Sequence, residues 1–318
     1  MDERTIIARL QEIFATTADP DLLVGIGDDA ALIRIGETNG GLVIATDLLT
    51  EGTHFNREWS DPYSIGRKAA AANLADIFAM GIPPRYLLVA VALRPEDEGD
   101  IFDLARGIAD ESLSVGARVI GGDLSRSEAL TVSITALGRT TSQDSTEVVT
   151  RKGAKPGDGL FILADRLGLP GRSLLGLEQL QRGIHVDLDS LKFHRAPQVP
   201  YQSFLSVAKV ATSLCDISDG IMFDATALAA ASGVTIDIDS VAIHSHPHFD
   251  LIEAVAKELG LDPVLVALTS GEEHSPLFTV DAGTLIPDAW QIGRVIPRGD
   301  SLLMQDGSGI EAVGFSHF

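Results

Sequence analysis

Cysteine is almost absent from this sequence, since Cys215 is the only one among 318 residues. A single cysteine cannot form a disulfide within the chain, which excludes a disulfide-stapled secreted fold and indicates a reducing compartment. The first residues, MDERTIIARLQEIF, are charged from the second position and lack the apolar segment of a signal peptide. We therefore expect a cytoplasmic protein.

Long apolar runs and basic residues are also scarce. The uncharged stretch 196–208 contains two prolines and two glutamines, and it is shorter than the roughly 20 residues that span a bilayer. Lysine and arginine together number 24 against 45 aspartates and glutamates, which gives a formal net charge of −21. Because nucleic acids and anionic membranes attract proteins through basic patches, neither is expected as a partner.

Aspartate is the residue in excess, and it supplies 29 of the 45 acids. It is typical of turns, helix caps and hard-cation sites rather than of exposed helix faces. Charged residues make up 22% of the chain and hydrophobic residues 45%, which are ordinary values for a globular protein, so the acidity does not indicate disorder. The positions of the aspartates are therefore more informative than the net charge.

The pattern of apolar residues predicts an α/β protein with two domains. Apolar β-like runs at 41–49, 86–93, 117–120 and 129–138 alternate with helical patterns, and the same alternation resumes after residue 158. The stretch between them is polar. We place the domain boundary there, which gives domains at 1–145 and 146–318.

One predicted helix carries polar residues on its apolar stripe. Asp61 can cap this helix, Pro62 suits its first turn, and Gly81 ends it. Asn73 and Asp76 share the stripe with apolar residues at helical spacing. A polar pair on a buried stripe needs polar partners from elsewhere in the fold.

The first acidic motif is GIGDDA at residues 25–30, where Asp28 and Asp29 sit in a glycine-rich turn. The motif fits the loose dinucleotide fingerprint G-x-G-x-x-A. We reject that interpretation because two carboxylates would repel a pyrophosphate and a strand-like segment follows instead of a helix. Two interpretations remain: a Mg²⁺ site built from hard carboxylate oxygens, or an ordinary surface turn capped by aspartate.

Other aspartates lie at the ends of apolar strands or on the polar helix stripe: Asp47, Asp76, Asp123, Asp216 and Asp219. In open α/β folds, ligands gather beyond the carboxyl ends of the strands. Several buried carboxylates in such places imply compensating cations. The phosphate-binding motif G-x-x-x-x-G-K-[ST] is missing from the sequence, so phosphate binding would depend on metal ions.

Eight motifs occur in register from Gly25 to Phe318: GIGDDAA, ATDLLTEGTHF, GRKAAAANLADIFAMGIPP, VIGGDLSRS, TRKGAKPGD, CDISDGIMFD, SGEEH and GFSHF. Together they resemble the thiamine-monophosphate kinase family, of the superfamily that includes aminoimidazole ribonucleotide synthetase. The resemblance implies that superfamily's two-domain α/β (α+β) fold, with an N-terminal mixed sheet and helices and a C-terminal α/β domain. It also implies a homodimer formed through the N-terminal sheet.

The resemblance implies an activity as well. This is the ATP-dependent phosphorylation of thiamine monophosphate to thiamine diphosphate, by direct in-line transfer with several Mg²⁺ ions. The N-terminal domain would bind ATP and Mg²⁺ and form the dimer, and the C-terminal domain would complete the ATP and substrate sites. The acceptor phosphate is already ionised near neutral pH, so positioning and charge neutralisation would supply most of the catalysis.

The resemblance also implies roles for individual residues. The metal ions would be held by Asp29, Thr46, Asp47, Asp76, Asp123, Asp216 and Asp219. ATP would contact Gly122, Asp123, Arg151 and Ser218. The thiamine end would contact His54, Glu272 and Phe315, and the catalytic residues would be Asp47, Asp123 and Arg151. An exposed linker position for Arg151 is the alternative.

Two departures from the family pattern keep other functions open. Ala45 stands where a hydroxyl residue usually precedes the Thr-Asp pair, and Glu273 replaces the usual aspartate. The alternatives are another ATP-using member of the same superfamily and a non-catalytic protein that binds nucleotide or divalent cations.

Four remaining residues are less informative. His244, His246 and His248 alternate around a proline, which indicates a loop rather than a zinc site. Cys215 has no basic neighbour in the sequence that would lower its pKa, so we expect a buried structural residue.

Overall fold

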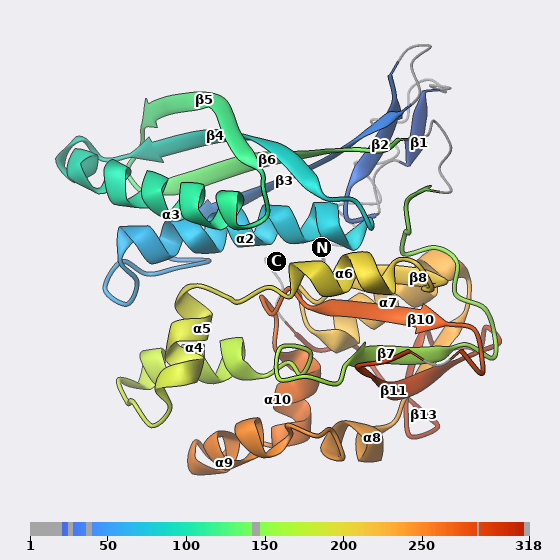
Figure 1. Cartoon of the computed structure of the whole chain (residues 1–318). Coiled ribbons are helices and arrows are strands. Elements are labelled where there is room, and N and C mark those ends of the chain that lie inside the picture. Colours follow the sequence, from blue (N-terminus) through green and yellow to red (C-terminus); the bar gives the residue numbers. More distant parts are fainter. Residues whose placement is uncertain (1–20, 25–27, 36–39, 142–146, 285, 315–318) are drawn as a thin grey trace.

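The computed structural model describes residues 21–24, 28–35, 40–141, 147–284 and 286–314. In this part of the chain two mixed β-sheets, each accompanied by helices, lie one above the other (Figure 1). The predicted α/β fold is confirmed: the N-terminal sheet is mixed, as expected, and the sheet of the C-terminal half is mixed as well. The predicted boundary at 145/146 lies within residues 142–146, outside the described residues.

The first sheet has six strands in the order β1-β2-β3-β6-β4-β5. Only β4 and β5 are parallel, and the other neighbours are antiparallel. The strand bounds are β1 Leu22–Val24, β2 Ala31–Arg34, β3 Gly41–Thr50, β4 Pro84–Leu93, β5 Arg118–Arg126 and β6 Thr131–Arg139. The parallel pair is joined through a 3-10 helix, η1 Pro95–Asp100, and helix α3 Ile101–Ser114.

Helix α2, Pro62–Ala79, lies between the first sheet and the second half of the chain (Figure 1). It is buried nearly all round, as its run of small residues allows. Asp61 caps the helix and accepts a 2.9 Å hydrogen bond from the Ser64 backbone N–H, while Gly81 beyond its end has a φ of 75°. The predicted beginning and end of this helix are confirmed.

The second sheet has seven strands in the order β13-β12-β9-β11-β7-β10-β8, with only β9 and β12 parallel. Its strand bounds are β7 Gly159–Leu163, β8 Ser213–Asp216, β9 Thr235–Ile238, β10 Pro276–Val280, β11 Ala289–Ile296, β12 Leu303–Gln305 and β13 Ser308–Gly309. The helices of this half are α4 Arg172–Arg182, α5 Leu188–Arg195, α6 Tyr201–Val207, α7 Ile221–Ser232, α8 Ser240–His244, α9 Asp250–Glu258 and α10 Pro263–Thr269.

The hydrophobic core consists of several clusters, and one of them includes residues from both halves of the chain. One apolar cluster fills the space around α7 and the second sheet, while another runs from α2 and α3 of the first half to Phe204 and Phe278 of the second. Apolar burial across the junction stabilises one arrangement of the two sheets. Among the described residues, no helix is both long enough and apolar enough to cross a membrane.

The two faces of the first sheet differ. Helices α2 and α3 cover one face, where Val43, Val132 and Ile134 are buried. On the opposite face Leu48 and Leu88 are 53% and 43% exposed. Side chains alternate between the faces along each strand, so successive residues of β3 point to different environments.

Candidate functional site

Three carboxylates from distant parts of the chain meet at the junction of the two halves. Asp29 precedes β2, Asp76 lies in the last turn of α2, and Asp216 ends β8. One carboxylate oxygen from each lies within 4.8 Å of the other two. The sequence predicted all three as metal ligands, and the fold brings them together.

The oxygens of this cluster are poorly satisfied by the protein. Asp29 Oδ2 and Asp216 Oδ1 are buried and have no hydrogen-bond partner in the described part of the chain. Burial raises the pKa of Asp29 to about 8, although Arg151 opposes the rise, and the Asp216 and Asp28 charges add to it. Burial and the neighbouring Asp47 and Asp216 carboxylates also hold the pKa of Asp76 well above its usual range.

This donor set fits divalent cations. Mg²⁺ takes oxygen ligands, and its charge would relieve both the repulsion and the missing hydrogen bonds of the buried carboxylates. A cluster of acids whose only role was structural would normally have its buried oxygens paired.

Arg151 reaches the cluster from the segment between the two sheets. Its Nη2 lies 2.5 Å from Asp29 Oδ1, and its backbone N–H donates to both Asp28 carboxylate oxygens at 3.1 and 3.2 Å. The side chain is 20% exposed, so the alternative of an exposed linker arginine is wrong. The alternative of an ordinary surface turn at Asp28 and Asp29 is wrong for the same reason, since the Asp29 side chain is only 1% exposed.

Asp47 lies on the helix-facing side of β3. Its backbone N–H donates to Asn73 Oδ1 at 3.0 Å, and Asn73 Nδ2 donates to the Ala69 carbonyl at 2.9 Å. Both polar atoms of the Asn73 side chain therefore have the hydrogen-bond partners expected for a polar residue on a buried helix stripe. Burial raises the pKa of the Asp47 carboxyl. The His274 charge opposes this rise and the Asp216 charge adds to it, so Asp47 is electrostatically coupled to the cluster.

Ser218 and Asp219 lie in the turn between β8 and α7. The Ser218 carbonyl accepts a 2.7 Å hydrogen bond from the Glu272 backbone N–H, which ties this turn to the 271–274 loop. Gly271 permits the approach, since a Cβ there would lie 2.6 Å from the Ser218 carbonyl oxygen. The Asp219 backbone N–H donates to Asp224 Oδ2 at 3.3 Å.

Thr46, Gly122 and Asp123 lie apart from the carboxylate cluster. Thr46 points to the open face of the first sheet, where its hydroxyl donates to the Ile134 carbonyl at 2.9 Å. Gly122 and Asp123 are exposed on the edge strand β5, three strands from β3 in the sheet order. The structure of one chain therefore does not gather all seven predicted metal ligands around one point.

His54 lies in the loop between β3 and α2, and its Nδ1 accepts a 3.0 Å hydrogen bond from the Thr50 backbone N–H. Glu272 approaches from the second half, and the link between the two is Lys68 of α2. Lys68 Nζ donates to the His54 carbonyl at 2.9 Å and lies 2.8 Å from Glu272 Oε1. Two of the three residues predicted to meet the thiamine end are therefore held by a common partner.

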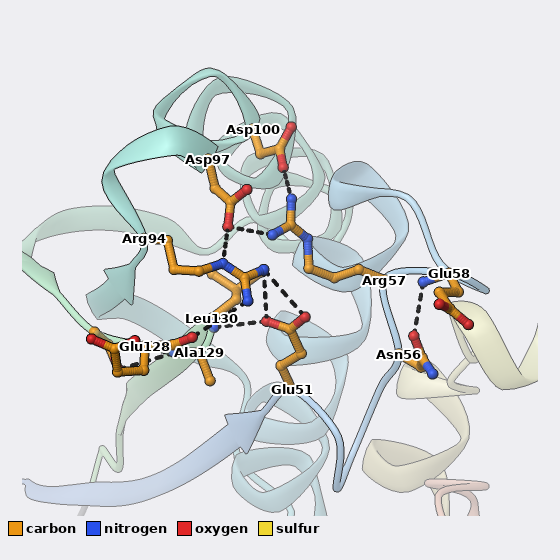
Figure 2. A network of polar contacts seen from close by, with 11 residues as sticks. Glu51, Asn56, Arg57, Glu58, Arg94, Asp97, Asp100, Glu128, Ala129 and Leu130 are labelled. Carbon is orange, nitrogen blue, oxygen red and sulfur yellow. Dashed lines mark hydrogen bonds and ion pairs between the residues drawn. The ribbon is translucent and has the colours of Figure 1, made fainter.

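A charged network fixes the other side of the His54 loop (Figure 2). Arg57 pairs with Asp97 and Asp100 of η1. Arg94 Nε lies 2.7 Å from Asp97 Oδ2 and its Nη2 lies 3.4 Å from Glu51 Oε1. Glu51 also accepts a 3.0 Å hydrogen bond from the Leu130 backbone N–H, so the loop is tied to the end of β4, to η1 and to β6.

Four functional candidates were missed from the sequence. Lys68 lies within the motif GRKAAAANLADIFAMGIPP, but the resemblance assigned it no role. Asp224, 3% exposed, follows the DISDG motif by one helical turn. His274 Nδ1 lies 2.9 Å from Asp216 Oδ2, and that carboxylate raises the pKa of His274 although burial opposes the rise. His194 offered no motif at all.

The remaining expectations concern single residues. Cys215 is free and buried, as predicted. His246 and His248 lie in the loop between α8 and α9, as predicted, but His246 is 3% exposed and its Nε2 lies 2.9 Å from the Leu163 carbonyl oxygen, so it is buried rather than solvated. Phe315 lies outside the described residues.

Comparison with known proteins assigns the family. Residues 27–140 match the family model described as AIR synthase related protein, N-terminal domain. A thiamine-monophosphate kinase of Mycobacterium tuberculosis is 36% identical over 289 residues, covering 90% of this chain and 83% of the relative. One of Aquifex aeolicus is 32% identical over 302 residues, covering 92% of each. A solved structure, AaThiL complexed with AMPPCP and TMP, superposes with a TM-score of 0.86 at 28% identity, covering 100% of this chain and 97% of that one. The chain belongs to the thiamine-monophosphate kinase family.

Proposed function

We propose that this protein transfers the γ-phosphoryl group of ATP to the phosphate of thiamine monophosphate, giving thiamine diphosphate and ADP. The observation that carries the proposal is the cluster of Asp29, Asp76 and Asp216, with Arg151 against it, at the junction of the two halves. Similarity to AaThiL, which was solved with an ATP analogue and TMP, supports the choice of substrates.

The carboxylate cluster would hold Mg²⁺. Asp29, Asp76 and Asp216 offer ligand oxygens directly, Asp47 is electrostatically coupled to Asp216, and Asp219 lies in the turn that follows β8. When bound, the ions would neutralise the phosphate groups of both substrates and so allow two anions to approach each other. Two unit charges 4 Å apart repel by about 4 kcal/mol at an effective dielectric constant of 20, so carboxylates alone would exclude the substrates.

The protein's own contribution is positioning. Arg151 is fixed at its backbone by Asp28 and at its guanidinium by Asp29, and a planar guanidinium in this place can contact phosphate oxygens with two N–H groups. Ser218 would contribute to ATP binding from the turn after β8. The acceptor phosphate needs no strong general base, so transfer is direct and in line.

Gly122 and Asp123 have a separate position on the edge strand β5. Both are exposed, so ATP would meet them only where it extends along this edge of the first sheet. For Asp123 to act in catalysis and Thr46 to bind a metal ion, bound ions or a second copy of the chain on the open face would have to complete their sites.

The thiamine end would lie against the His54 loop and the Glu272 carboxylate. Glu272 is held at a backbone φ of 58°, and its side chain is 31% exposed. A partly exposed carboxylate suits a cationic thiazolium and an aminopyrimidine donor. Phe315 would stack on the pyrimidine ring.

A homodimer would cover the open face of the first sheet. Leu48, Tyr86 and Leu88 on this face are between 42% and 53% exposed. A contiguous apolar face of a sheet is typical of an interface between subunits. The edge strand β5 borders the same face.

Transfer of isotopic label tests the proposed reaction. Incubation of the full chain with γ-labelled ATP, thiamine monophosphate and Mg²⁺ should place the label in the terminal phosphate of thiamine diphosphate. With a chiral γ-thiophosphate, a single in-line displacement gives inversion of configuration. Label in free phosphate alone, or retained configuration, would contradict the proposal.

A further inference from the structure

Lys68 occupies a place where a charge is costly. Its side chain is only 3% exposed, and it belongs to a helix whose buried residues extend round nearly the whole circumference. Taking an ammonium group out of water costs several kcal/mol unless an opposite charge and hydrogen bonds replace the water. The contacts of Lys68 should therefore explain why the helix retains it.

The ammonium group joins two of the residues expected at the thiamine end, His54 and Glu272. Lys68 Nζ donates to the His54 carbonyl at 2.9 Å and lies 2.8 Å from Glu272 Oε1 and 2.9 Å from Glu272 Oε2. Lys68 and Glu272 are 204 positions apart in the chain. A single side chain thus connects the loop after β3 with the loop after α10.

Glu272 needs such a partner because its own environment gives it few others. Its backbone is in the left-handed region, and burial alone would raise the pKa of its carboxyl, but the pKa is lowered because the Lys68 charge opposes burial and His274 makes a smaller contribution in the same direction. His194 Nδ1 is 3.8 Å from Glu272 Oε2 and 3.3 Å from Ser173 Oγ. Burial, together with the Lys68 charge, lowers the pKa of His194 to about 3, so this imidazole is neutral at neutral pH. Lys68 is therefore the main positive charge that faces Glu272.

The exposed fractions of the three side chains show which of them faces solvent. Lys68 is 3% exposed and His194 6%, whereas Glu272 is 31% exposed. The lysine and the imidazole lie behind the carboxylate and the carboxylate faces outward, as expected for a ligand-contacting group supported by buried neighbours.

We propose that Lys68 is a positioning residue for the acceptor substrate, which holds the Glu272 carboxylate and the His54 loop at the separation that thiamine monophosphate requires. This inference rests on the proposed function, in which His54 and Glu272 contact the thiamine end. Lys68 touches neither the substrate nor the reacting phosphates in this account. Its effect passes through Glu272 and through the His54 backbone.

A second buried contact between the halves provides a matched control. The Tyr201 hydroxyl of α6 donates to Glu111 Oε1 of α3 at 2.8 Å, and Tyr201 and Glu111 are 8% and 5% exposed. Like the Lys68 bridge, it joins the first half of the chain to the second. Unlike that bridge, it contacts neither His54 nor Glu272. Tyr201→Phe therefore removes an interdomain hydrogen bond without touching the proposed substrate contacts.

The test compares steady-state kinetics of the full chain with those of Lys68→Met, Lys68→Gln, Lys68→Arg and Tyr201→Phe, with the thermal midpoint of each measured alongside. Lys68→Met should raise the KM for thiamine monophosphate by about tenfold or more while the KM for ATP changes less than about twofold. Lys68→Arg keeps the charge and should recover part of the loss. Tyr201→Phe should lower the thermal midpoint and leave the KM values for thiamine monophosphate and ATP unchanged.

A double-mutant cycle with Glu272→Gln isolates the contact. If Lys68 acts through Glu272, the second substitution should add little to the first, so the coupling is strong. Should Lys68→Met fail to fold, Lys68→Gln provides the same comparison with a smaller change in polarity.

The results that overturn the proposal are distinct from those that overturn the function. Two results would show that Lys68 has only a structural role while leaving the kinase activity unquestioned. One is additive effects of the Lys68 and Glu272 substitutions. The other is an equal rise in the KM values for both substrates in the Lys68 and Tyr201 variants. Failure of the unmodified chain to phosphorylate thiamine monophosphate would overturn the proposed function, and this inference with it.

Discussion

The guanidinium of Arg151 lies 2.5 Å from the carboxylate of Asp29, and this pair joins the segment between the two sheets to the loop before β2. The Asp29 side chain is 1% exposed and its second oxygen has no partner in the described part of the chain. The pair thus leaves one buried oxygen for a cation while the arginine retains further N–H groups for phosphate.

Arg151→Met should lower kcat by about 10² to 10³, because it removes a preorganised donor from the place where phosphate charge develops. The matched control is Arg166→Met, since Arg166 pairs with the exposed Asp189 on the surface and is 47% exposed. Rapid-quench measurement of the chemical step separates this effect from a change in nucleotide affinity. Equal kinetics for the two variants would contradict the role of Arg151.

Mg²⁺ should stabilise the protein more at pH 8 than at pH 6. The raised pKa of Asp29, about 8, means that the metal-free fold binds more protons than the unfolded chain between the ordinary value of 3.8 and about 8. Stability of the metal-free protein therefore falls as the pH rises through this interval. Mg²⁺ binds the deprotonated carboxylates, and at 100 times its Kd it would add about 2.7 kcal/mol.

Differential scanning calorimetry with and without Mg²⁺ checks this dependence, and Asp76→Asn is its companion variant. Removing one of the like charges should raise the midpoint of the metal-free protein at pH 8 and abolish most of the response to Mg²⁺. A thermal midpoint that Mg²⁺ does not change at any pH would exclude the cluster as a cation site.

Glu273→Ala should destabilise the fold by about 3 to 5 kcal/mol, because it leaves a buried charge without its counterpart. Glu273 Oε1 accepts hydrogen bonds from the Gly171 and Ser173 N–H groups and from Ser270 Oγ at 2.7 to 2.9 Å. Its charge also faces Arg172. Burial lowers the pKa of the Arg172 guanidinium, and the Glu273 charge partly offsets that lowering. Urea denaturation measures the loss. Glu178→Ala, at a surface pair, is the control and should change little.

Arg94→Ala should loosen the His54 loop, because Arg94 joins Glu51 of that loop to Asp97 of η1 (Figure 2). The expected result is a higher KM for thiamine monophosphate and faster hydrogen exchange over residues 51–58, with kcat for saturated enzyme nearly retained. Arg106→Ala breaks an exposed pair with Asp103 on α3 and should leave both properties unchanged. Unaltered exchange in the Arg94 variant would show that the loop is held by other contacts.

Leu88→Glu should convert a homodimer to monomers, because it places a charge on the open apolar face of the first sheet. Light scattering coupled to size exclusion gives the mass directly. Leu113→Glu changes a leucine on α3, on the helix side of the sheet, that is 58% exposed against 43% for Leu88, and it should leave the mass unaltered. A wild-type mass equal to one chain would rule out the dimer.

The sequence was sufficient for the elements whose signals are local. The helix 62–79 could be predicted because its cap, its first-turn proline and its terminal glycine act within a few residues. The meeting of Asp29, Asp76 and Asp216 could be inferred because Asp29 sits in a glycine-rich acidic turn, Asp76 on the buried stripe of a helix and Asp216 at the end of a strand.

Contacts that depend on the packing of the two halves could not be predicted. The motif that contains Lys68 gives no sign of its contacts, because its partner Glu272 is 204 positions away. His194 enters the site only because α5 packs beside α4, where Gly176 allows the helices to approach. The separation of Asp123 from Asp47 follows from strand order, since β6 and β4 lie between β3 and β5.

The central claim is that the acidic cluster serves phosphoryl transfer to a phosphorylated acceptor, and one assay tests it most directly. ADP formation is measured at fixed Mg²⁺ with thiamine monophosphate, with thiamine, with an aminoimidazole-pathway substrate and with no acceptor. The account predicts ADP only with thiamine monophosphate, in equal amount to thiamine diphosphate. ATP turnover that is the same without thiamine monophosphate, or no turnover with it, would contradict the account.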